Sequence, residues 1–106
     1  MRLTPFQQQT ICQNAQHFFG EQTQIWLFGS RVDDNKRGGD IDLYIEPQLQ
    51  EMNDVVIAKL KFLRALHLSL GEQKIDVVLA VNKTNPLPIY QIAKQTGVPL
   101  HYANYS

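Results

Sequence analysis

Residues 25–46, IWLFGSRVDDNKRGGDIDLYIE, decide the fold of this chain, because two apolar segments flank a polar loop there. The short apolar runs at residues 25–28 and 41–45 are rich in branched and aromatic residues, so each predicts a strand. The glycines and polar residues between them are typical of a loop. Since side chains alternate between the two faces of a strand, Asp40 and Asp42 share one face, and the apolar residues around them share the other.

The acidic face of the second strand is expected to open to solvent or to a ligand. Two carboxylates about 6 to 7 Å apart in a dry interior would repel each other and partly neutralise. The stretch KIDVVLAV, residues 74–81, predicts a third strand in which Asp76 points away from its apolar neighbours. Asp40, Asp42 and Asp76 can therefore converge on the bare side of the sheet, where an oxygen-rich cluster suits Mg²⁺.

Three helices complete the predicted fold. Thr4, Pro5 and Gln7 resemble a helix start, and Gly20 ends that helix. A second helix covers residues 52–70, and a short third one carries Ile89, Ile92 and Ala93, with Gly97 closing it. The order α, β, β, α, β, α predicts an α/β (α+β) fold, a small mixed β-sheet with helices packed on one face, in a single domain over residues 1–106.

Apolar residues occupy more than one face of the helix predicted at residues 52–70. Its core stripe is predicted from helical spacing to be Met52, Val56, Leu60, Leu63 and Leu70, with Val55 and Leu66 flanking it. Ile57 and Leu68 lie roughly 100° or more from that stripe. They would offer a patch for another subunit if exposed, and the alternative is that a tail or the final helix covers them.

Composition limits the function classes. Ten Lys and Arg balance ten Asp and Glu, so the chain has formal net charge zero and no basic stripe of the kind that tracks nucleic acid. The single Cys12 cannot form an internal disulfide, and the first residues lack the apolar core of a signal peptide. No apolar run approaches the roughly 20 residues that cross a bilayer. A reducing cytoplasm is the expected location.

Gly29 and Ser30 add a phosphate-binding element to the acidic strands. Glycine lets a phosphate approach the backbone closely, and Ser30 can cap a following helical turn whose N–H groups favour anions. Arg31, with Lys36 or Arg37, would help to offset the phosphate charge. Phosphates here would bridge to cations on the aspartates, which describes phosphoryl or nucleotidyl transfer assisted by two metal ions.

These residues resemble the nucleotidyltransferase superfamily of DNA polymerase beta, and within it the minimal nucleotidyltransferases. The resemblance is close over residues 25–46 and looser at Asp76 and the tail GVPLHY. It implies that Gly29 and Ser30, with Arg31 and Gly39, bind the nucleotide of ATP. It implies also that Asp40, Asp42 and Asp76 bind two Mg²⁺ ions and carry the catalysis, with Asp76 helping to take the proton from the attacking hydroxyl. Two departures concern the loop: nine residues separate Ser30 from Asp40, where many members have ten, and Gly39 stands where serine is common.

The resemblance also implies a partner. Minimal nucleotidyltransferases of this size resemble antitoxins that transfer AMP from ATP to a hydroxyl, typically a tyrosine, of a HEPN-type helical RNase toxin. Two alternatives remain open: a weakly active or inactive module that neutralises its partner by contact, and a transferase that acts on a small molecule. The neutral charge argues against RNA as the substrate.

Overall fold

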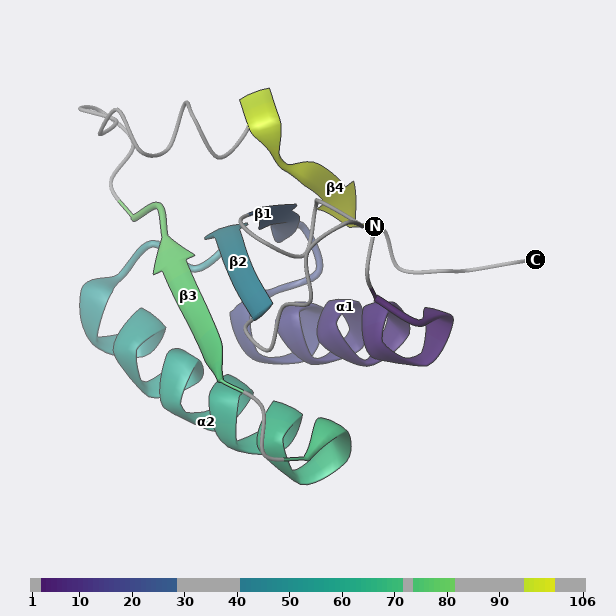
Figure 1. Ribbon diagram of the computed structural model, residues 1–106. Helices are drawn as coiled ribbons and strands as arrows, with labels where there is room; N and C mark the ends of the chain where they lie inside the picture. The colour runs from purple at the N-terminus through teal and green to yellow at the C-terminus, as the bar shows by residue number, and fades with distance from the viewer. Residues whose placement is uncertain (1–2, 29–40, 72–73, 82–94, 101–106) are drawn as a thin grey trace.

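The computed structural model describes residues 3–28, 41–71, 74–81 and 95–100, and these form two helices and a four-stranded mixed sheet. The elements follow the chain in this order: α1 (Pro5–Phe19), β1 (Gln24–Phe28), β2 (Ile41–Glu46), α2 (Met52–Leu70), β3 (Ile75–Leu79) and β4 (Val98–Leu100). Both helices lie on the same side of the sheet, as Figure 1 shows. The predicted α+β class, with helices on one face of a small mixed sheet, is therefore confirmed.

The start of α1 is fixed by a capping box, as predicted. The Gln7 N–H donates to the Thr4 hydroxyl oxygen at 3.1 Å, and the Thr4 N–H donates back to the Gln7 side-chain oxygen at 2.9 Å. The helix ends at Gly20, which has φ +115°. A Cβ at Gly20 would lie 2.6 Å from the Cβ of Gln48, so the turn into β1 requires glycine both for its backbone angle and for this close contact.

The strands are ordered β3-β2-β1-β4 across the sheet. β1 pairs antiparallel with both β2 and β4, whereas β2 and β3 run parallel. The parallel pair needs a crossover, and α2 provides it. β4 was not predicted, because its central residue, Pro99, has no N–H to donate to a neighbouring strand. Proline is tolerated there because β4 is an edge strand of the sheet. The helix predicted to carry Ile89, Ile92 and Ala93 lies outside the described residues.

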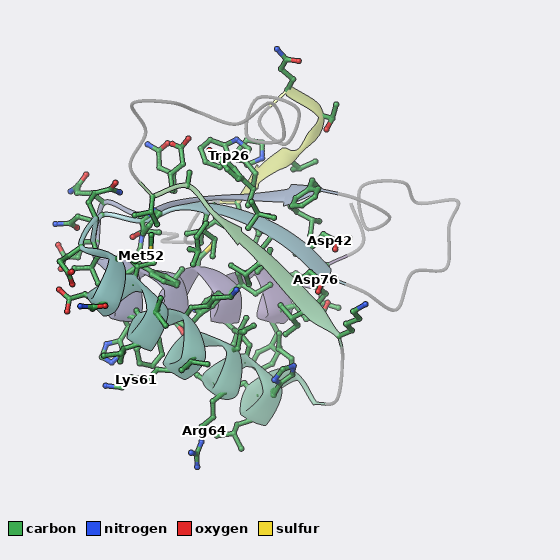
Figure 2. The ribbon with its side chains drawn as sticks, turned by 90° about the vertical axis from the view of Figure 1, so that its left-hand side faces the viewer. Trp26, Asp42, Met52, Lys61, Arg64 and Asp76 are labelled. Carbon is green, nitrogen blue, oxygen red and sulfur yellow. The ribbon has the colours of Figure 1, made fainter. Side chains whose placement is uncertain are left out.

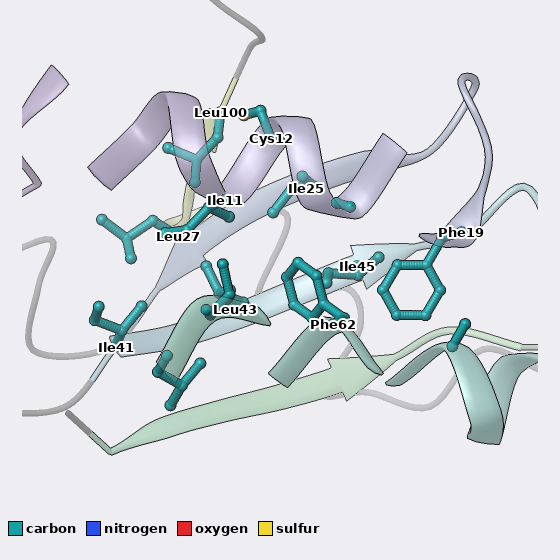
Figure 3. Close-up of a cluster of buried hydrophobic side chains, with 14 of the residues drawn as sticks. Ile11, Cys12, Phe19, Ile25, Leu27, Ile41, Leu43, Ile45, Phe62 and Leu100 are labelled. Atoms are coloured by element: carbon teal, nitrogen blue, oxygen red, sulfur yellow. The ribbon is translucent and has the colours of Figure 1, made fainter. Parts of the chain in front are cut away.

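The main core lies between the helices and the sheet (Figure 3). Both helices and all four strands contribute fully or nearly buried side chains to it, among them Ile11, Phe19, Leu27, Ile41, Leu43, Ile45, Phe62, Leu66 and Leu100. The rings of Phe19 in α1 and Phe62 in α2 meet edge to face with centroids 5.3 Å apart. This contact joins the two helices beneath the sheet.

The predicted core stripe of α2 is wrong. Its buried residues are Val55, Ala58, Phe62 and Leu66, whereas Met52, Val56 and Leu60 are half or more exposed. Leu63 and Leu70 are only partly buried at the margin of the core. Apolar residues repeat at helical spacing on both faces of α2, and the face with Ala58 and Phe62 is the one that packs against the sheet.

Candidate functional site

Two of the three predicted carboxylates stand side by side in the sheet. Asp42 of β2 and Asp76 of β3 are partners in the parallel register, and both are the second residue of their strand. The Ile41 N–H donates to the Lys74 carbonyl oxygen at 2.9 Å, which fixes the register just before both aspartates. Figure 2 shows the two aspartates at the same end of the sheet. This register makes Asp42 and Asp76 neighbours, whereas Asp40, the third carboxylate of the predicted cluster, lies outside the described residues.

Both aspartates belong to the face of the sheet that is turned away from the helices. Their neighbours Ile41, Leu43 and Ile75 are buried in the main core beneath the sheet, so alternation places Asp42 and Asp76 on the other face. Asp42 is half-buried, and the side chain of Asp76 is 52% exposed. A ligand arriving from solvent can therefore reach the Asp76 carboxylate.

Lys74 forms an ion pair with Asp76. Its Nζ lies 4.0 Å from Oδ2 of Asp76, and the Lys74 side chain is 68% exposed. Such an exposed ion pair contributes little to stability, so the lysine can swing away when a ligand binds. Sequence reasoning did not single out Lys74, although its position two residues before Asp76 puts it on the same face.

The last residue of β1 lies at the same end of the sheet as these two aspartates. Phe28, the last described residue before the Gly29-Ser30 corner, is the register partner of Asp42. The chain thus leaves β1 beside the Asp42 and Asp76 pair. The other predicted site residues, Gly29, Ser30, Arg31, Gly39 and Asp40, fall within 29–40 and lie outside the described residues.

The face that carries the aspartates is not bare, which corrects the sequence-based expectation. It holds a second apolar cluster of Tyr44 and Ala80, with Trp26, Phe28 and Val78 packed against them. Tyr44 is only 1% exposed, its ring centroid lies 5.3 Å from that of Trp26, and its hydroxyl donates to Glu46 Oε2 at 2.8 Å. The carboxylate pair therefore occupies one end of this face, beside a hydrophobic patch.

The pair has the donor chemistry that Mg²⁺ requires, since carboxylate oxygens are hard ligands. Within the part of the chain that the structure describes, no group of three or more His, Cys, Asp or Glu residues could hold a metal ion. Asp42 and Asp76 supply two carboxylates, and the third predicted ligand, Asp40, is among the residues not described. The arrangement of the described pair is compatible with a cation bound between β2 and β3.

Comparison with models of known protein families finds no match to this chain, and comparison with curated proteins finds none either. Among the described helices, neither is long and apolar enough to cross a membrane.

Proposed function

We propose that this chain is a Mg²⁺-dependent nucleotidyltransferase that transfers AMP from ATP to a hydroxyl group. The observation that carries the proposal is the register pairing of Asp42 with Asp76 at one end of the sheet, beside the strand end that leads into Gly29 and Ser30. Two carboxylates next to a glycine-serine corner suit a nucleotide whose phosphates need both N–H donors and cations.

The reaction makes one bond and breaks one. The acceptor hydroxyl oxygen attacks the α-phosphorus of ATP, the bond from that phosphorus to the bridging oxygen of the β-phosphate breaks, and pyrophosphate leaves. The hydroxyl proton goes to the Asp76 carboxylate, which is exposed enough to meet an acceptor. Bound Mg²⁺ would neutralise charge on the phosphates.

Each remaining site residue has a role in this proposal. Asp40 and Asp42 hold the metal ions together with Asp76. Gly29 and Ser30 would bind the triphosphate through backbone N–H groups and a hydroxyl, Arg31 would offset its charge, and Gly39 would also contact the nucleotide.

The proposed acceptor is a protein partner, a HEPN-type helical toxin that AMP transfer would silence. The proposed compartment is the reducing cytoplasm, since Cys12, the single cysteine of the chain, is free and buried. The second candidate is a binding module that neutralises its partner by apolar contact. The exposure of Ile57 and Leu68, at 52% and 77%, favours that candidate because both side chains are accessible to a partner.

Asp76→Asn separates the two candidates. For a transferase, we expect it to preserve the fold and the partner complex while reducing AMP transfer by about 10²-fold or more, the scale of a general base and metal ligand. The assay combines labelled ATP and Mg²⁺ with the protein and the co-expressed product of the neighbouring gene, and follows the label on the partner.

Glu21→Gln is the matched control, since it makes the same carboxylate-to-amide change at an exposed residue after α1. It should transfer AMP at the wild-type rate. The transferase is ruled out if the wild-type protein places no label on the partner and Asp76→Asn still neutralises it fully.

A further inference from the structure

The side of α2 that faces away from the sheet is unusually apolar. Of the six large hydrophobic side chains that are exposed in the described residues, five belong to this helix: Met52, Val56, Ile57, Leu60 and Leu68. Ile57, Leu60, Arg64 and Leu68 recur at spacings of three and four, so they form one stripe, which we name the outer face of α2. Figure 2 shows Arg64 and Lys61 on this side of the molecule, directed away from the sheet.

Charge is distributed unevenly along the same helix. Its acidic groups are at the start, with Glu51 at the N-cap and Asp54 in the first turn. Its lysines and its arginine, Lys59, Lys61 and Arg64, follow in the middle, and His67 lies in the last turn. In an antiparallel copy of the helix, Asp54 near the start can meet Arg64, which lies ten residues further along.

We propose that two copies of this chain pair through their α2 helices, antiparallel about a two-fold axis near Leu60 and Lys61. Leu60 then lies next to Leu60 of the second copy. Asp54 lies within about 6 Å, measured along the helix, of Arg64 of the second copy, at 1.5 Å of rise per residue. An arginine side chain spans that offset, so each dimer contains this ion pair twice.

The surface also supplies a knob and a recess that fit each other in this arrangement. Leu68 is the most exposed of these side chains, at 77%, and it lies near the end of α2. A groove between α1 and α2 lies nearer the other end, and its lining includes the apolar Phe18, Leu49 and Ile57 and the polar His17, Asp54 and Lys61. Antiparallel pairing sets Leu68 of each copy level with the groove of the other, which makes the contact isologous and closed.

The pairing goes beyond the proposed function and does not depend on it. The outer face of α2 lies on the helix side of the molecule, whereas Asp42 and Asp76 lie on the opposite face of the sheet, so both sites of a dimer stay open. One helix per copy makes a small interface, and we expect a dissociation constant of about 1 to 100 µM.

Sedimentation velocity over a concentration series tests the pairing. The wild-type chain should approach twice the 12.2 kDa of one chain as concentration rises. Leu68→Glu should weaken the dimer by at least about 10-fold, because it would replace an apolar contact with Phe18, Leu49 and Ile57 by a charge. Phe6→Glu is the matched control: Phe6 is 62% exposed but lies on α1, and its replacement should leave the dimer unchanged.

A charge exchange distinguishes this arrangement from other dimers. Asp54→Arg and Arg64→Glu should each weaken self-association, because each sets like charges opposite one another. An equimolar mixture of the two variants should form heterodimers, since both ion pairs are then restored with reversed polarity in one of them. Circular dichroism confirms that each variant is folded.

A wild-type chain that remains monomeric up to the highest concentration overturns the proposal, even if the same face binds a different protein. Failure of the mixed variants to associate overturns the antiparallel arrangement. Loss of the dimer in Phe6→Glu would do the same, because it would place the contact at the start of α1, away from the groove beside Phe18.

Discussion

Asp42 is a charged residue between two fully buried ones, Ile41 and Leu43, each 0% exposed. We expect Mg²⁺ with ATP to raise the melting temperature of the wild-type chain, because ligand that binds only the folded state stabilises it by about 2.7 kcal/mol at 100 times its Kd. For a domain of this size, that corresponds to roughly 10 °C or more. Asp40→Asn and Asp42→Asn should largely remove the shift, as measured by differential scanning fluorimetry.

Glu21→Gln should keep the full shift, because it alters an exposed carboxylate outside the sheet. Equal shifts in the wild type and in both aspartate variants would refute a role for these residues in binding the nucleotide.

Cys12 provides a second test at the level of one residue. Burial raises the pKa of its thiol from 9.0 to about 11, because the thiolate would lose its hydration. Between those values, the unfolded chain releases the proton and the folded chain keeps it, so stability should fall as pH rises. Between pH 8.5 and 11, we expect the free energy of unfolding of the wild type to fall by about 1 to 2 kcal/mol more than that of Cys12→Ala. Urea titrations at pH 8.5 and 11 measure the difference, and parallel pH profiles would contradict it.

At the level of the element, α2 offers a matched pair of substitutions. Leu66 is 0% exposed and Leu60 is 65% exposed, so the same change at both sites compares the two faces directly. Leu66→Ala should cost about 2 to 5 kcal/mol through the cavity it leaves. Leu60→Ala should stay within about 0.5 kcal/mol, measured by denaturant unfolding at low protein concentration. Similar losses at both sites would show that Leu60 is also buried in the folded monomer.

The helices illustrate what the sequence can predict. The bounds of α1 follow from local chemistry, since Thr4, Pro5 and Gln7 act within one turn. The position of α2 follows in the same way, but its buried face does not. Periodicity identifies apolar stripes but does not indicate which of them packs against the sheet. In α2, large apolar side chains lie on both faces, since Phe62 is buried and Leu60 is exposed.

The strands show the same division between local and long-range information. β1, β2 and β3 are readable as apolar runs, and strand alternation alone sets the phase of Asp42 and Asp76. Their alignment in one register depends on the parallel pairing of β2 with β3, a long-range contact that alternation does not specify. β4 has only three residues with a central Pro99, so its pairing with β1 leaves no periodic signal in the sequence.

For the whole molecule, we expect one cooperative unfolding transition. The radius of gyration is 13.1 Å, and about 13 Å is typical of one compact domain of this length. Trp26, the single tryptophan, packs with Tyr44 on the face of the sheet opposite to the helices. Trp26 fluorescence and far-ultraviolet circular dichroism therefore report on opposite faces, and their urea transitions should coincide. Separate midpoints would show that the second cluster unfolds independently of the main core.

The strand order has a consequence for the chain while it is being synthesised. β1 emerges early, but its second neighbour, β4, emerges only after β2, α2 and β3, and Asp76 emerges only after α2 is complete. One edge of β1 therefore stays unpaired until β4 has been made, and an unpaired edge can recruit strands from other chains. Ribosome-bound fragments that end before residue 98 should consequently aggregate readily and bind chaperones, and the Asp42 and Asp76 pair should be absent from every fragment that ends before β3.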